Sequence, residues 1–264
     1  MKNAEQLHLY PMPNERVSAF STTRHGGEGN GAYGSFNCTP YTGDDPDVVL
    51  ANQQLLCKLV GVTEERLIVP YQTHSCNVLA IDEAFMQLSS EERHAMLQEK
   101  DAIITSIPNV CLCVSTADCV PVLLYDSVQE VVAAVHAGWR GTVGKIVSHT
   151  LQVMRENYGT QARDVHAIIG PNISLKAFEV GIEVYEAFEN AGYDMTQIAH
   201  WHPEKEKYHI DLPMANHLQL LVEGVPHGQI HDSHICTYTQ HEDFFSARRL
   251  GIRSGRILNG IVLK

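Results

Sequence analysis

The chain has 264 residues, a formal net charge of −12, 44% hydrophobic residues and 19% charged residues. This length can bury a full core, and the composition is ordinary for a globular protein rather than a disordered one. The acidic balance argues against a general binder of nucleic acid or of anionic membranes, because phosphate contacts need a basic surface. No stretch approaches the roughly 18 apolar residues of a membrane span, and the first residues lack the form of a signal peptide. We therefore expect a cytoplasmic location.

The seven cysteines are an odd number, and no secretory context accompanies them. This predicts reduced thiols rather than a disulfide framework. They include no C-x-x-C pair, so neither a structural zinc ribbon nor a thioredoxin-like site is expected.

The first part of the chain predicts short strands, loops and one helix. Residues 17–22 have the pattern of a strand, and the glycine-rich residues 26–34 must be a loop. A glycine-rich loop that begins near Arg24 can bring backbone N–H groups close to an anion, but it fits a flexible surface loop equally well. Asp45 or Asp47 can cap a helix over residues 48–60.

The next part is predicted to be rich in short strands. Residues 67–70, 78–81, 101–105 and 111–115 are short and apolar, and a polar helix is expected over residues 89–98. His74 lies at a strand end, where a single histidine is more often structural than functional.

Two apolar runs then predict an antiparallel hairpin. Residues 120–125 and 131–135 flank a turn at Asp126 and Ser127. Cys119 directly precedes the first run and His136 directly follows the second, so paired strands bring the thiol and the imidazole to the same end of the sheet. Such a pair suits either a metal site or a Cys–His dyad, and the spacing alone leaves both open.

A glycine-bearing turn and a helix follow the hairpin. The helical period of the apolar residues predicts a helix over residues 143–158. Its N-terminus would lie beside His136 and Arg140, and the free N–H groups and dipole there favour an anion. Gly138 and Gly141 could equally serve a tight turn and close packing.

The remaining chain predicts strands at 165–170 and 257–263 and helices at 182–191 and 212–222, with a polar segment at 200–207. Residues 231–236 contain histidine, aspartate and cysteine, but no further ligand is spaced to complete a second metal cluster. Short strands interspersed with helices indicate one α/β domain without a linker or repeat.

Three motifs carry a specific resemblance: TADCVP at 116–121, HAGWRGT at 136–142 and QTH at 72–74. They resemble the bacterial YfiH family, also called the laccase-domain or multicopper polyphenol oxidoreductase family. The similarity extends over nearly the whole chain, although Ala247 stands where the family commonly has tyrosine. It implies a single YfiH-like domain over residues 1–264, an α/β (α+β) fold in which a mixed-sheet sandwich is flanked by helices.

The resemblance also implies a bound metal, usually zinc, with His74, Cys119 and His136 as ligands. Two neutral imidazoles and one thiolate would leave Zn²⁺ with one net positive charge and an open fourth position, as a catalytic zinc requires. A water held there has its pKa lowered towards about 7. Copper could occupy the same ligands, because affinity orders favour Cu²⁺ over Zn²⁺.

The family is associated with purine nucleoside metabolism, which implies purine nucleosides and phosphate as small-molecule partners. The expected reactions are phosphorolysis of adenosine, inosine and methylthioadenosine, and deamination of adenosine by a metal-activated water. Guanidinium groups suit phosphate because they bind it in bidentate geometry. The candidate catalytic residues are Cys119, His136, Asp118 and Arg140. The candidate substrate- or phosphate-binding residues are Arg24, Asn37, Gly138 and Arg248. Asp118 adjoins Cys119, but adjacent strand residues point to opposite faces, so its acid–base role is only a candidate.

Three other hypotheses stay open at this stage. Cys119 could be a nucleophile with His136 as its base, for example in an amidase acting on peptidoglycan precursors. The family name suggests a copper polyphenol oxidase, although such enzymes use repeated His-x-His pairs and this chain has one, at His200 and His202. A non-catalytic metal-binding or partner-binding module would turn over no nucleoside.

Overall fold

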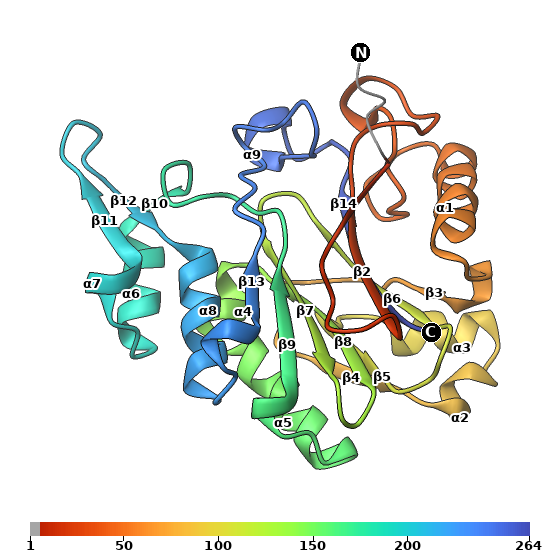
Figure 1. Cartoon of the computed structure of the whole chain (residues 1–264). Helices are drawn as coiled ribbons and strands as arrows, with labels where there is room; N and C mark the ends of the chain where they lie inside the picture. Colours follow the sequence, from red (N-terminus) through yellow and green to blue (C-terminus); the bar gives the residue numbers. More distant parts are fainter. Residues whose placement is uncertain (1–5) are drawn as a thin grey trace.

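Two β-sheets pack face to face at the centre of the structure, and helices cover their outer faces (Figure 1). The computed structural model describes residues 6–264. Both central sheets mix parallel and antiparallel pairs, which confirms the predicted mixed-sheet sandwich flanked by helices.

The six-stranded sheet has the order β13-β9-β7-β8-β5-β4. Its centre is the predicted hairpin, which is confirmed: β7 and β8 pair antiparallel, with Pro121 opposite His136 and Asp126 opposite Val131. The strands of this sheet are β4 (Val78–Ile81), β5 (Ala102–Thr105), β7 (Val120–Asp126), β8 (Val131–Ala137), β9 (Val165–Ile169) and β13 (Ile230–Asp232).

The five-stranded sheet has the order β1-β2-β14-β6-β3. Its central strand, β14, comes from the far end of the sequence and pairs antiparallel with β2 on one side and with β6 on the other. The strands are β1 (Leu7–Leu9), β2 (Val17–Thr22), β3 (Leu67–Ile68), β6 (Cys111–Thr116) and β14 (Ile257–Leu263).

The strands of the hairpin are apolar throughout because both of their faces are buried. On β7, Val122 and Leu124 face the helices, whereas Leu123 and Tyr125 face the other sheet. The hairpin therefore lies in the middle of two core layers, and its ends are held rigidly.

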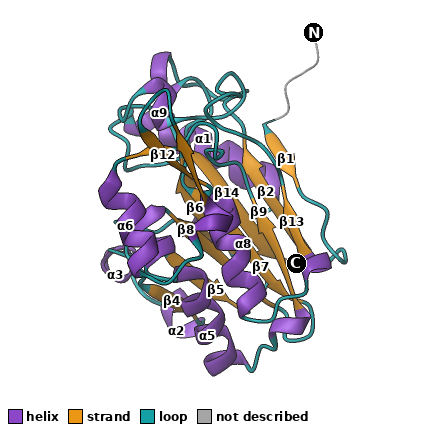
Figure 2. Cartoon of the chain, turned by 90° about the vertical axis from the view of Figure 1, so that its left-hand side faces the viewer, coloured by secondary structure: helices purple, strands orange, loops and turns teal. Residues whose placement is uncertain are grey.

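Helices cover both outer faces of the sandwich. On the six-stranded sheet, α5 (Ile146–Tyr158), α6 (Ile182–Asn190) and α8 (Leu212–Val222) bury their apolar sides (Figure 2). On the five-stranded sheet, α1 (Pro46–Val60) buries Leu56, and Asp45 caps this helix by accepting the backbone N–H of Asp47. Shorter helices are α2 (Glu83–Met86), α3 (Ser90–Met96), α7 (Met195–Ile198) and α9 (Ala247–Leu250).

The sequence predicts one helix over residues 143–158, and the predicted start of this helix is wrong. The structure has a short helix, α4 (Trp139–Val143), and a break before α5 begins at Ile146. Lys145 adopts φ +63°, the left-handed region, which interrupts the helical path. Apolar residues keep their helical spacing across the break, so this spacing alone could not show where one helix ends and the next begins.

Residues 200–207, predicted only as a polar segment, belong to a β-hairpin in the structure. The strands β11 (Ala199–His202) and β12 (Lys207–Ile210) pair antiparallel, and β10 (Glu179–Val180) completes a small sheet with them. Aromatic packing supports it, since Tyr208 stacks on Tyr185 with ring centroids 4.0 Å apart and both rings pack against the core. Within residues 6–264, no helix is both long enough and apolar enough to cross a membrane.

Substituting Gly260 by alanine should destabilise the fold. Gly260 lies opposite Phe20 in the β14–β2 ladder, and a Cβ there would overlap the Phe20 ring and lie 2.8 Å from Cys113 Sγ. Overpacking of this kind costs about 1–3 kcal/mol, which urea unfolding would measure. Gly228→Ala is the matched control, because a Cβ there meets nothing within 4 Å. Equal stabilities for both variants would contradict this packing.

Candidate metal centre

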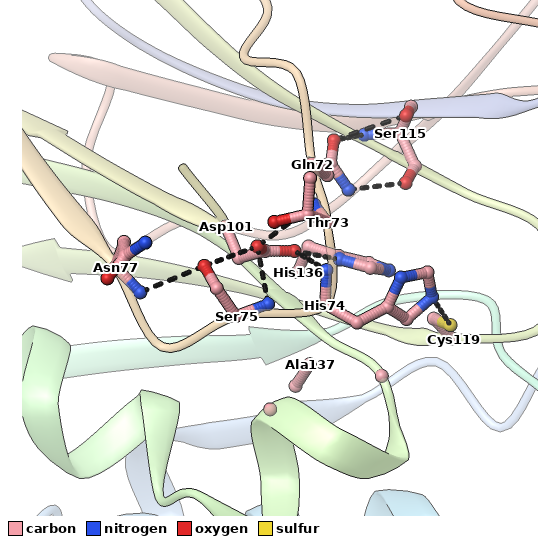
Figure 3. Close-up of polar contacts among 12 residues, drawn as sticks. Gln72, Thr73, His74, Ser75, Asn77, Asp101, Ser115, Cys119, His136 and Ala137 are labelled. Carbon is pink, nitrogen blue, oxygen red and sulfur yellow. Dashed lines mark hydrogen bonds and ion pairs between the residues drawn. The ribbon is translucent and has the colours of Figure 1, made fainter. Parts of the chain in front are cut away.

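Three potential metal ligands converge at one end of the central hairpin (Figure 3). Cys119 directly precedes β7, His136 is on β8, and His74 is on the loop between β3 and β4. The Sγ of Cys119 lies 3.7 Å from the Nε2 of His74, and the two imidazole rings have centroids 4.8 Å apart. The strand pairing thus brings Cys119 and His136 together as the sequence predicted, and the loop supplies His74.

The buried carboxylate of Asp101 positions two of the three ligands. Asp101 directly precedes β5, which pairs with β8, and its Oδ1 lies 2.7 Å from the Nδ1 of His136. The same carboxylate accepts the consecutive backbone N–H groups of Thr73, His74 and Ser75 at 3.2, 3.0 and 2.7 Å. Figure 3 shows this carboxylate between the loop and the His136 ring. One side chain therefore orients an imidazole and shapes the loop that carries the other.

Asp101 was not among the residues predicted for the site. The sequence shows only that it starts a strand, and its function depends on which strand lies beside β5. Pairing of residues 102–105 with 132–135 would have placed Asp101 next to His136. The sequence alone does not reveal this antiparallel register, and so it could not identify Asp101 as part of the site.

A second contact ties the ligand loop to the other sheet. The side-chain amide of Gln72 donates to the carbonyl of Ser115 at 2.8 Å and accepts the Ser115 backbone N–H at 2.7 Å. Gln72 thereby continues the hydrogen bonding of β6 as a neighbouring strand would. The candidate metal centre lies where the chain passes from β6 of one sheet to β7 of the other.

Charge coupling in this cluster favours a thiolate. Burial alone would raise the pKa of Cys119, but the imidazoles of His136 and His74 outweigh it and lower the pKa to about 6. Burial would lower the pKa of His136, yet Cys119 and Asp101 raise it to about 9. The cluster is therefore built to hold a positive charge between a thiolate and a carboxylate, and a bound metal cation satisfies the same requirement.

The donors fit a metal ion with three protein ligands. All ligand atoms lie within 4.8 Å of one another. In a tetrahedral zinc site, a sulfur and a nitrogen ligand are separated by roughly 3.5 Å, close to the 3.7 Å between Cys119 and His74. Because Asp101 engages the Nδ1 of His136, the Nε2 of that ring is the atom left for a metal. His136 is buried and His74 is exposed, so the cluster opens to one side.

Gly138 allows the ligands to approach closely. It precedes α4, and a Cβ at this position would lie 2.7 Å from the His74 ring and 3.2 Å from Cys119 Sγ. Close packing against His74 and Cys119 thus explains why this position holds a glycine. Its predicted role in phosphate binding stays a prediction.

The three potential metal ligands form part of the wall of a cavity of about 350 Å³. This volume lies in the range of about 300–1,000 Å³ that is common for small-molecule sites. A larger cavity, of about 720 Å³, lies beside α5 and α8 and includes none of the ligands. The other residues that line the cavity at the ligands include Thr39, Tyr41, Tyr71, Gln72, Ile252 and Arg256.

The three arginines predicted for the site, Arg24, Arg140 and Arg248, do not line this cavity. Arg24 donates to the carbonyls of Gly34 and His241 and lies over the Phe245 ring. Arg140 is exposed and lies over its neighbour Trp139, whereas Arg248 donates to the carbonyl of Glu179. The predictions for these arginines stay predictions, and Arg256 is the arginine at the cavity wall.

Two further predicted residues support the surroundings of the cavity. Asn37 is buried; its amide donates to Thr42 and Asp44, and its Oδ1 accepts the backbone N–H of Arg256. The carboxylate of Asp118 accepts hydrogen bonds from Thr237, Ser246 and the backbone N–H of Arg248 at 2.6–2.7 Å. Asp118 thus anchors the segment before β14, and its acid–base role stays a prediction.

The fold and the ligand cluster define a mixed-sheet sandwich with a His–Cys–His site at the junction of its sheets. A family profile described as multi-copper polyphenol oxidoreductase laccase matches residues 18–264. The chain belongs to this family, and the resemblance drawn from the motifs is confirmed.

Relatives of known structure or name cover nearly the whole chain. A purine nucleoside phosphorylase of Bacteroides thetaiotaomicron is 54% identical over 100% of this chain and 96% of its own length. The adenosine deaminase RL5, from an unknown prokaryotic organism, is 44% identical over 95% of each chain. The crystal structure of YlmD from Geobacillus stearothermophilus superposes with a TM-score of 0.91 at 28% identity, covering 100% of this chain and 98% of that one. The protein is accordingly an enzyme, as predicted.

Replacing Asp101 by asparagine should weaken metal binding. The variant removes the charged acceptor of the His136 N–H, and loss of such a partner costs about 10–100-fold in metal affinity. Competition titration with a chelating dye would measure the dissociation constant for zinc. Asp126→Asn is the control, since this buried aspartate lies at the other end of β7 and accepts two backbone N–H groups there. Unchanged zinc affinity in the Asp101 variant would contradict its proposed orienting role.

Proposed function

We propose that the protein is a zinc-dependent purine nucleoside enzyme. It cleaves adenosine, inosine and methylthioadenosine with phosphate to give the free base and ribose 1-phosphate or methylthioribose 1-phosphate, and it deaminates adenosine to inosine. The observation that carries this proposal is the coincidence of three metal ligands with the wall of a ligand-sized cavity. The names of the two relatives, similar over almost the full chain, supply the substrate class.

Zinc suits the ligand set that His74, Cys119 and His136 provide. Imidazole and thiolate are common zinc ligands, and three protein ligands leave one coordination position open. When bound, zinc supplies a Lewis acid at that position. The family description points to copper instead, and the same donors bind Cu²⁺. Metal analysis of the protein as purified from its native host would decide between the two metals.

The residues of the chain itself provide orientation and charge. Asp101 fixes the tautomer of His136 by accepting from its Nδ1, so the Nε2 faces the cluster. Arg256 adds a positive charge at the cavity wall. Burial lowers its pKa, and the charges of Cys119 and Asp118 act in the opposite direction, but a guanidinium stays protonated in proteins.

The two reactions place different demands on this cavity. In phosphorolysis, a phosphate oxygen forms a bond to C1′ of the ribose while the bond from C1′ to N9 of the base breaks. A cation near phosphate favours this attack by holding the anion in place. In deamination, water adds at C6 of the base and ammonia leaves. We assign the phosphate contact to Arg256, because its charged side chain lies at the cavity wall. The guanidinium also donates to the carbonyls of Ser254, Gly255 and Ile252, which hold it in place.

Liquid chromatography of reactions with zinc-loaded protein tests the proposed function. Adenosine, inosine and methylthioadenosine are each incubated with and without phosphate. We expect phosphate-dependent release of free base from all three, and inosine from adenosine without phosphate. Base release that does not depend on phosphate would rule out phosphorolysis, and an absence of all turnover at full metal occupancy would favour a non-catalytic module.

Substituting His136 by alanine should remove metal and activity together, because the ring is a ligand and also holds the charge opposite Asp101. Zinc content by elemental analysis and turnover of adenosine are both measured. His74→Ala tests an exposed ligand, for which folding is less at risk, and exposed His149 on α5 gives the control His149→Ala. Stoichiometric zinc in the His136 variant would overturn the ligand assignment. Activity that survives complete metal removal from the wild type would instead favour a hydrolase with Cys119 as nucleophile.

Substituting Arg256 by glutamine should raise the KM for phosphate by about 10–100-fold, the size expected for loss of a charge-assisted hydrogen bond. The KM for adenosine in phosphate-free deamination should change little. Arg140→Gln and Arg248→Gln are measured beside it, because the sequence predicts both arginines for the site and both lie outside the cavity wall. A larger effect in either of them would move the phosphate site to that residue.

A further inference from the structure

A buried hydroxyl without a partner lines the cavity beside the candidate metal centre. Thr39 is 2% exposed, and among the described residues its Oγ1 has no hydrogen-bond partner. The backbone of Thr39 is already engaged: its N–H donates to Asn37 and its carbonyl accepts from Thr42. A buried hydroxyl normally finds a partner, because it loses its water on folding. Thr39 therefore lines the cavity and carries a hydroxyl whose donor and acceptor are both unused within residues 6–264.

Two tyrosine rings line the same cavity. Tyr41 and Tyr71 meet edge to face, with centroids 4.9 Å apart and planes at 88°. They are 36% and 40% exposed, so both rings are accessible to a ligand. Tyr71 is anchored by its backbone N–H to the carbonyl of Leu97, and it is three residues from the ligand His74. The two rings thus form one aromatic surface on the cavity wall.

We propose that Thr39, Tyr41 and Tyr71 form the subsite for the purine base, with a tyrosine ring against the face of the base and the Thr39 hydroxyl bonded to its edge. This inference rests on the proposed function and adds the residues that recognise the base. A flat heteroaromatic ring stacks on an aromatic side chain, and such contacts tolerate different bases. A hydroxyl can donate to a ring nitrogen or to O6 of inosine, and it can accept from the amino group of adenosine. The same subsite therefore accommodates both substrates.

The subsite has a kinetic signature, because phosphorolysis and deamination use the same base. Loss of a base contact should raise the KM for adenosine by a similar factor in the two reactions. The KM for phosphate and the zinc content should stay at wild-type values, since neither depends on these side chains. General damage to the fold would change the KM for phosphate and the zinc content as well as the KM for adenosine.

The test uses the full-length, zinc-loaded protein. Tyr71→Ala should raise the KM for adenosine about 10–100-fold in both reactions, and Tyr71→Phe should retain most of the affinity because the ring remains. Thr39→Val keeps the shape and should raise this KM about tenfold without lowering the melting temperature, because the hydroxyl has no partner to lose. Tyr185→Ala is the matched control, since Tyr185 stacks on Tyr208 outside the cavity. A Thr39→Val variant with lower stability and unchanged KM would overturn the proposal.

Calorimetric titration of the zinc-loaded protein with inosine, without phosphate so that neither reaction can occur, separates this proposal from the proposed function. Binding by the wild type that Tyr71→Ala and Thr39→Val weaken supports the subsite, even if no reaction is ever detected. Turnover by the wild type together with unchanged affinity in both variants overturns the subsite and leaves the proposed function in place. Absence of both binding and turnover in the wild type overturns both.

Discussion

The hydrogen bonds of the Asp101 carboxylate hold the candidate metal centre together. One buried anion joins the end of β5 to the His136 ring on β8 and to the three consecutive N–H groups of the loop that carries His74. It thereby links the two histidine-bearing segments directly to each other. The carboxylate is itself favoured in its charged form: burial would raise its pKa, but the contacts with His136 and Ser75 lower it to about 2.

The sandwich gives this centre its rigidity and its opening. The hairpin that carries two ligands is buried on both faces, by helices on one side and by the second sheet on the other. The ligand loop is bound to that second sheet through the amide of Gln72. Rigid strands therefore hold Cys119 and His136, while His74 and the cavity lie towards solvent. Small-molecule chemistry needs both properties, because reacting groups must be fixed and substrate must still enter.

Much of this arrangement follows from local patterns in the sequence. Two apolar runs around Asp126 and Ser127 predict the hairpin, and the hairpin places Cys119 beside His136; helix α1 and its Asp45 cap are equally local. What the sequence could not predict depends on contacts between distant segments. The register that brings Asp101 to His136 is one example, and the left-handed backbone at Lys145 is another. Thr39 and Tyr41, near the start of the chain, and Arg256, near its end, come to one cavity only through the fold.

The place of β14 in the five-stranded sheet has a consequence for how the protein folds. This strand, near the end of the described chain, lies between β2 and β6, and the hydroxyl of Ser21 bonds to Asn259 across 238 positions. Non-local pairings of this kind slow folding, because a long loop must close before they form. During synthesis, β2 and β6 leave the ribosome long before the strand that separates them. Until it arrives, the two strands have unpaired edges that could pair wrongly with other chains. The growing polypeptide is thus exposed to misassembly through most of its synthesis, and shielding of those edges by chaperones would matter most at that stage.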